Sequence, residues 1–257
     1  MRYKDFPSQI YIENTNKCNS HCIMCPREKH VRKQGVMGYA LYEKLIQEIA
    51  RFKKEVERVH LHNYGEPLLD KEFLRKIKPA KSSGIKHVYF VTNASLLTEK
   101  ISCELVGSGA DEFKISFNGT DPLTYNSTMQ GLDFDRTLQN ILNFIRIRRE
   151  AGSQRPRIII QYIPQGSNGA RSAEFKKLFH KVIDASAGDS LMVVSLHNYG
   201  GGKTYCSLRR DDRRVCPFPW EIMMILWDGR VSTCCMDYNG IQILGGCFEG
   251  SVTTALE

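Results

Sequence analysis

Residues 9–26 read QIYIENTNKCNSHCIMCP. The stretch opens with a run of β-branched and aromatic residues at Gln9–Glu13, which predicts a strand. A polar loop follows and spaces Cys18, Cys22 and Cys25 as Cys-x3-Cys-x2-Cys. Three thiolates on one tight loop can converge on an iron–sulfur cluster, because soft sulfur ligands suit iron. Only three cysteines face the four irons of a cubane, so one iron stays open to another molecule.

The rest of the chain alternates strand and helix patterns. Further strands are predicted at Val56–His62, Lys86–Thr92, Glu112–Phe117, Arg157–Ile163 and Leu191–Leu196, and the clearest amphipathic helices at Tyr39–Phe52, Phe134–Arg149 and Ala173–Ile183. This alternation predicts an α/β fold with a parallel sheet under helices. Six strand–helix repeats are too few for a closed eight-stranded barrel, so we expect an open, partial β/α barrel. Its chemistry should gather on loops at the C-terminal ends of the strands.

A second loop motif follows the second predicted strand, where residues 60–69 read HLHNYGEPLL. Gly65 permits close backbone approach, Glu66 contributes charge and Pro67 fixes the turn. The cysteine loop after strand one and Gly-Glu-Pro after strand two resemble the radical S-adenosylmethionine (SAM) superfamily over the first 70 residues. The resemblance implies a 4Fe-4S cluster on the three cysteines and SAM bound through its amino group at Gly65-Glu66-Pro67. It implies reductive cleavage of SAM to a 5′-deoxyadenosyl radical, which abstracts hydrogen from a substrate.

The resemblance also implies further SAM contacts. Met24 precedes the third cysteine, Asn93 and Ser116 end the third and fourth predicted strands, and Gln161 lies in the fifth. Asn93 and Ser116 are also plausible turn formers. The run Ile158–Ile160 leaves the direction of Gln161 open. Gln130 stands where many relatives carry a basic residue before a glycine, so an ion pair to the SAM carboxylate lacks its usual partner there.

The last third resembles the start of a SPASM or twitch extension. Asp228-Gly229 lies between two apolar runs and predicts a hairpin that brings Cys216 near Cys234 and Cys235. In that family such cysteines hold an auxiliary iron–sulfur cluster, whereas a metal-free hairpin is the alternative. We expect a barrel over residues 1–205 and an extension over 206–257. The extension looks short for the family, and no spacing argument assigns Cys206 or Cys247 to a ligand set.

The composition indicates the cellular compartment and the kind of partner to expect. The chain has 257 residues, 42% of them hydrophobic, nine cysteines and a formal net charge of +8. It shows no secretory signal and no long apolar run, so we expect a cytoplasmic protein without membrane contact, in which clustered cysteines serve as ligands. The positive charge is more typical of a basic solvated surface, and the basic runs lack interleaved aromatic residues, so nucleic acid is not the expected partner.

Two function classes remain open from sequence. The first is a radical SAM enzyme that acts on a carbohydrate, aminocyclitol or peptide and receives electrons from a donor such as flavodoxin or ferredoxin. About eight residues precede strand one, which favours a small molecule or sugar, or a separately encoded leader-binding partner. The second is a zinc-binding interaction module, with RNA as a partner that the positive charge would suit, in which His21 or His30 completes a Cys3His site. Cys103 lies on a predicted helix and is expected in the core.

Overall fold

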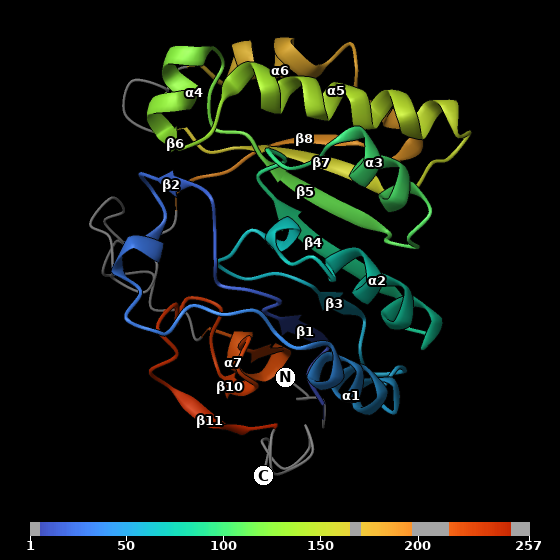
Figure 1. Cartoon of the computed structure of the whole chain (residues 1–257), viewed down its shortest axis with the longest axis vertical. Coiled ribbons are helices and arrows are strands. Elements are labelled where there is room, and N and C mark those ends of the chain that lie inside the picture. The colour runs from blue at the N-terminus through green and yellow to red at the C-terminus, as the bar shows by residue number, and fades with distance from the viewer. Residues whose placement is uncertain (1–5, 165–170, 197–215, 248–257) are drawn as a thin grey trace.

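The structure is a computed structural model that describes residues 6–164, 171–196 and 216–247 (Figure 1). The helices are α1 (Tyr39–Ala50), α2 (Phe73–Ser82), α3 (Glu99–Val106), α4 (Pro122–Thr128), α5 (Phe134–Glu150), α6 (Ser172–Phe179) and α7 (Phe218–Glu221). The strands are β1 (Gln9–Ile12), β2 (His21–Cys22), β3 (Arg58–His60), β4 (His87–Thr92), β5 (Glu112–Ser116), β6 (Met129–Gln130), β7 (Arg157–Tyr162), β8 (Ser190–Val193), β9 (Ile222–Ile225), β10 (Arg230–Ser232) and β11 (Ile243–Gly246).

Nine of these strands form one open sheet in the order β11-β10-β9-β1-β3-β4-β5-β7-β8. Strands β1, β3, β4, β5, β7 and β8 run parallel, and they correspond to the six strands predicted from sequence. The α/β fold with an unclosed, mostly parallel sheet is therefore confirmed. The C-terminal ends of parallel strands meet along one edge, so the loop after β1 and the loop after β3 lie at the same end of the sheet.

Alternation along the strands separates a helix-covered face from an inner face. Strand pairing sets Ile10 beside Val59 and Val59 beside Val88, all fully buried in the hydrophobic core. The helices α1, α2, α3 and α5 run along the right and upper sides of the sheet in Figure 1. Residues one position away, such as Tyr11 and His60, point to the opposite, inner face. Polar and aromatic side chains thus collect inside the partial barrel.

The C-terminal hairpin continues the sheet. Strand β9 pairs in parallel with β1, and β10 returns antiparallel to β9. Gly229 has a φ of 81° in the connecting turn, a conformation that glycine adopts without strain. The hairpin expected at Asp228-Gly229 is present, and it is joined to the barrel sheet along its edge. The predicted domain boundary and Cys206 lie outside the described residues.

Several local features differ from the sequence predictions. A short antiparallel pair joins β2 to β6, which no sequence pattern indicated. Helix α2 contains Pro79 and buries Lys76, whose ammonium lies 2.6 Å from Asp70. The prediction for Cys103 is wrong, because its side chain is exposed on α3. Within the described residues, no helix combines the length and apolar character needed to span a membrane.

Candidate functional site

An open cavity of about 350 Å³ lies at the C-terminal ends of the parallel strands. It brings together most of the side chains that the sequence singles out. Those lining it are Cys18, Cys22, Met24, Cys25, Gly65, Glu66, Asn93, Ser116, Gln161 and Cys235. Pro67, Cys216 and Cys234 are not among the lining residues.

The cysteine loop is held by its own backbone and by the segment after α4. His21 pairs with Gln130 and Cys22 with Met129 across the short β2–β6 sheet. The Ser20 hydroxyl lies 3.0 Å from the Cys22 sulfur, and the Arg27 guanidinium donates to the Ser20 carbonyl over 2.8 Å. These contacts fix the loop between its first two cysteines, so the thiols are presented toward the cavity.

The thiols suit an iron–sulfur cluster better than a single ion. Burial raises the pKa of Cys18 to about 12, with Glu66 adding to the rise, and burial also raises the pKa of Cys22. Metal binding would therefore displace protons from these thiols. Among the described residues, no three His, Cys, Asp or Glu side chains are grouped so as to hold one metal ion. A cluster spreads its thiolate ligands more widely than one ion does, and the thiols surround an open space.

The two histidines expected as zinc ligands do not line the cavity with the three cysteines. His21 is exposed, and its Nδ1 lies 2.8 Å from a carboxylate oxygen of Glu28. The His30 ring stacks on Tyr238 at 5.6 Å and meets Tyr64 edge-on at 5.4 Å. Neither histidine joins the three cysteines in the lining of the cavity.

Gly65 is required by close packing between the two loops. A Cβ atom at this position would lie 2.0 Å from the Thr15 carbonyl oxygen, which belongs to backbone that cannot move aside cheaply. The next residue, Glu66, donates its backbone N–H to the Lys17 carbonyl over 2.8 Å. Pro67 then begins a 3-10 turn over Pro67–Leu69. The Gly-Glu-Pro segment is thus docked directly against the cysteine loop.

The carboxylate of Glu66 is buried, and three hydrogen bonds hold it in place. It accepts hydrogen bonds from the Thr92 hydroxyl at 2.7 Å, the Asn93 N–H at 2.7 Å and the Leu68 N–H at 3.1 Å. Burial raises the pKa of Glu66 to about 7, and these three hydrogen bonds oppose the rise. A cationic group brought into the cavity would favour the ionised carboxylate.

The remaining polar candidates lie around the same space. The Asn93 amide donates to Asn19 over 2.9 Å and reaches 4.0 Å from the Cys18 sulfur. Ser116 and Gln161 are register partners on β5 and β7, so both side chains face inward. Met24 is buried at the cysteine loop. Each can contact a molecule in the cavity, and their binding roles remain predictions.

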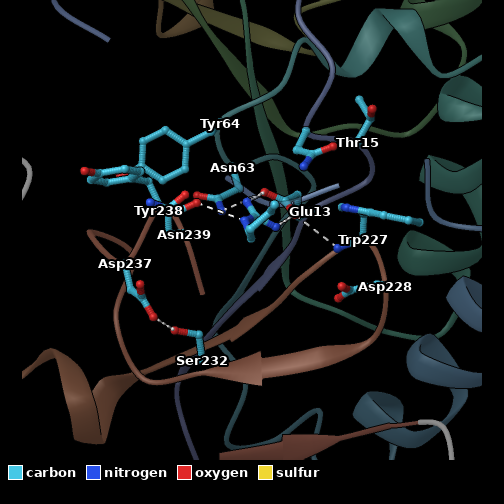
Figure 2. A network of polar contacts seen from close by, with 12 residues as sticks. Glu13, Thr15, Asn63, Tyr64, Trp227, Asp228, Ser232, Asp237, Tyr238 and Asn239 are labelled. Carbon is cyan, nitrogen blue, oxygen red and sulfur yellow. Dashed lines mark hydrogen bonds and ion pairs between the residues drawn. The ribbon is translucent and has the colours of Figure 1, made fainter. Parts of the chain in front are cut away.

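A buried charge network joins three segments beside the site (Figure 2). The Arg32 guanidinium makes two hydrogen bonds of 2.8 Å to Glu13, and both side chains are almost fully buried. Glu13 also accepts from the Asn63 amide at 3.0 Å and the Trp227 N–H at 3.1 Å. Arg32 Nε donates to the Tyr238 carbonyl over 2.9 Å. Sequence reasoning missed this network, which connects the cysteine loop, the segment before Gly65 and the C-terminal hairpin.

Of Cys216, Cys234 and Cys235, only Cys235 lines the cavity. Tyr64 donates its hydroxyl to the Cys235 carbonyl over 3.0 Å. Burial raises the pKa of Cys235 to about 11, and the nearby Cys234 and Cys216 add to the rise. Cys216 is exposed, whereas Cys247 is buried in the hydrophobic core, where Lys44 donates to its carbonyl. The hairpin therefore brings Cys216, Cys234 and Cys235 into one region.

Three further lining residues, Tyr11, His62 and Lys114, were not assigned to the site from sequence. All three lie on inward-facing positions of β1, β5 or the segment after β3. Alternation alone could have indicated that they face inward, because each is two residues from another inward-facing position. It could not indicate that the inner face opens into a cavity.

Comparisons with known proteins agree with this geometry. The model of the Radical SAM superfamily matches residues 12–154. A Pyrococcus furiosus protein, the tungsten-containing aldehyde ferredoxin oxidoreductase cofactor-modifying protein, is 24% identical over 88% of this chain and 70% of its own length. The S-adenosyl-L-methionine-dependent 2-deoxy-scyllo-inosamine dehydrogenase of Niallia circulans is 31% identical to this chain. The match covers 42% of this chain and 44% of that protein.

Solved structures share the fold over nearly the whole chain. BtrN in complex with AdoMet and 2-DOIA aligns with a TM-score of 0.67 and 19% identity, covering 99% of this chain and 83% of that one. Streptococcus suis SuiB bound to precursor peptide SuiA aligns with a TM-score of 0.76 and 15% identity, covering 98% and 65%. The family match spans more than half of the 257 residues and includes both loop motifs. The chain belongs to the radical SAM superfamily, whose enzymes use a 4Fe-4S cluster and SAM.

Proposed function

We propose that this enzyme abstracts hydrogen from a carbohydrate, aminocyclitol or peptide substrate bound in the cavity. The observation that carries the proposal is one cavity bordered by the thiols of the cysteine loop, by Gly65 and Glu66, and by inward-facing polar groups of the strands. When bound, the cluster and SAM supply a 5′-deoxyadenosyl radical for this step. The protein positions the reactants and limits access of water.

The chain's own residues have distinct tasks in this proposal. Cys18, Cys22 and Cys25 hold the cluster through their thiolates and leave one iron open. The Glu66 carboxylate, oriented by three hydrogen bonds, receives the SAM amino group. Gly65 keeps the backbone close enough for that contact. An ammonium–carboxylate pair in this buried setting would be stronger than one in water.

We assign Met24, Pro67, Asn93, Ser116 and Gln161 supporting roles in SAM binding. Met24 supplies apolar surface at the cysteine loop, and Pro67 fixes the turn after Glu66. Asn93 links the Glu66 carboxylate to the cysteine loop through its backbone N–H and its side-chain amide. Ser116 and Gln161 offer polar groups from neighbouring strands.

The C-terminal segment supports the SPASM/twitch branch as the subgroup. We propose that residues 206–257 form the extension and that Cys216, Cys234 and Cys235 contribute ligands to an auxiliary iron–sulfur cluster. Cys216 and Cys234 both add to the raised pKa of Cys235, which supports a shared ligand set. A reducing compartment keeps such thiols available, which supports a cytoplasmic location and a donor such as flavodoxin or ferredoxin.

The substrate class rests on relatives. The Niallia circulans relative is named for 2-deoxy-scyllo-inosamine, and the SuiB structure holds a precursor peptide, so both aminocyclitol and peptide stay within the proposal. The alternative from sequence, a zinc-binding module directed to RNA, is not supported, because residues 12–154 match the radical SAM superfamily.

Cleavage of SAM tests the proposed function. Cys18→Ala should abolish 5′-deoxyadenosine production by reconstituted, dithionite-reduced protein while leaving circular dichroism unchanged. Cys103→Ala is the matched control, because this cysteine is exposed on α3 and should retain full production. Undiminished 5′-deoxyadenosine from Cys18→Ala would overturn the assignment of the cluster site.

A further inference from the structure

Lys114 lies deeper in the barrel than the predicted SAM contacts. It is on β5, on the same face as Ser116 but two residues earlier, and it lines the cavity. Two residues of strand correspond to about 6–7 Å, so the Lys114 Cα lies that far below Ser116, away from the cysteine loop. Its register partners are Val91 on β4 and Ile159 on β7, and neither can neutralise an ammonium group.

The cavity contains no anion available to Lys114. Among the described residues that line it, Lys114 is the only Lys or Arg and Glu66 is the only Asp or Glu. Glu66 already accepts three hydrogen bonds. Glu112, one inward position below Lys114, is paired with Arg157. Within the part of the chain that the structure describes, Lys114 makes no hydrogen bond or ion pair with another side chain.

Two neutral donors line the same cavity as this ammonium. Burial lowers the pKa of His62 to about 3, with Lys114 adding to the effect, so the imidazole is neutral near pH 7. Its Nδ1 is buried without a hydrogen-bond partner in the described structure. Burial raises the pKa of Tyr11 to about 12, so its hydroxyl keeps its proton. The two rings lie 5.8 Å apart, and both residues line the cavity.

Charge balance then calls for an anion in the second molecule of the cavity. This step rests on the proposed function. SAM would carry a net positive charge, because its ammonium and sulfonium outnumber its one carboxylate, and Glu66 would pair with the ammonium. Burial lowers the pKa of Lys114, and the charge of Glu112 opposes this fall without a direct ion pair. A partly desolvated ammonium of this kind is costly unless it is paired. Lys114 therefore lacks a counter-charge until an anionic substrate is bound.

We propose that Lys114 binds an anionic oxygen group of the substrate, a carboxylate or a phosphate, with Tyr11 and His62 as neutral hydrogen-bond donors. The site thereby selects acidic or phosphorylated substrates and binds their anionic group deeper in the barrel than the predicted SAM contacts. In the competing assignment, Lys114 pairs with the SAM carboxylate instead, because Gln130 offers that carboxylate no basic partner. The two roles differ in whether an added anion and SAM bind together.

Calorimetric titration of the holoenzyme separates these roles. SAM is titrated first, and inorganic phosphate and acetate are then titrated separately at saturating SAM. The same series is run on Lys114→Gln, on Lys114→Arg, and on Lys100→Gln as a matched control, because Lys100 is exposed on α3. Lys114→Gln should weaken anion binding at least tenfold and leave SAM affinity unchanged, whereas Lys114→Arg and Lys100→Gln should retain anion binding within about threefold.

Each outcome has one meaning. Preference for phosphate indicates a phosphorylated substrate, and preference for acetate indicates a carboxylate; both support the proposal. It is overturned by competition between anion and SAM, by weaker SAM binding in Lys114→Gln, by unchanged anion binding in that variant, or by no anion binding to the wild type. Failure of the wild type to bind SAM at all would instead contradict the proposed function, and titration of the anions without SAM would still test Lys114.

Discussion

Removing Glu13 should destabilise the protein strongly, because it leaves a buried guanidinium without its partner. Glu13 is completely buried and accepts two 2.8 Å hydrogen bonds from Arg32, one from Asn63 and one from the Trp227 backbone. Breaking a buried pair by deleting one member costs about 3–5 kcal/mol. Glu13→Ala should therefore lower the free energy of unfolding by that amount.

Urea unfolding followed by tryptophan fluorescence measures this loss. With a denaturant slope of about 2–3 kcal/mol per M, the midpoint should fall by about 1–2.5 M. Glu72→Ala is the matched control, because it breaks an exposed carboxylate–arginine pair with Arg75, and it should cost no more than about 1 kcal/mol. Combining Glu13→Ala with Arg32→Met should recover part of the loss, since no buried charge is then left alone. Equal midpoint shifts for Glu13→Ala and Glu72→Ala would refute this account of the network.

Two further predictions concern single residues of the inner face and loops. Gly65→Ala should weaken SAM binding and lower stability, because the new methyl group meets the Thr15 carbonyl at 2.0 Å. Gly38→Ala, with no atom within 4 Å, should leave SAM binding unchanged and lower stability by no more than about 1 kcal/mol, because Gly38 is the N-cap of α1. Stability should also fall as pH drops below 6.5, because burial holds the pKa of His60 well below its usual range and the unfolded chain takes up the proton first. The loss from His60 should reach about 2 kcal/mol between pH 6.5 and 5, and His60→Phe should flatten the slope while keeping the ring stacked on Tyr11; an unchanged slope would contradict it.

The strands and the two loop motifs were predictable because their signals are local. Each predicted strand of the parallel sheet is present within a few residues of its expected bounds. The direction of Gln161 was not predictable, because isoleucines precede it on both faces of β7. Pairing with Ser116 on β5 settles it, and such pairing depends on residues far apart in sequence.

The missed features depend on long-range contacts. Helix α2 buries Phe73, Ile77 and Ala80 on one stripe despite its internal Pro79. Its Lys76 is also buried, with hydrogen bonds to Asp70 and the Met37 carbonyl. Lys114 gave no signal, since a lysine in a strand is usually solvated. Cys103 was misplaced because the prediction rested on Leu105 and Val106, which follow it on α3, whereas the Cys103 side chain is exposed.

Analysis of metal and sulfide, combined with electron paramagnetic resonance, tests the central claim most directly. The protein is purified without oxygen, reduced with dithionite and examined with and without SAM. The account predicts about four irons and four sulfides for the cluster on Cys18, Cys22 and Cys25, with a signal that shifts when SAM is added, and about six to eight irons if the auxiliary cluster is also present. Zinc without iron, or an iron signal that SAM leaves unchanged, would contradict it.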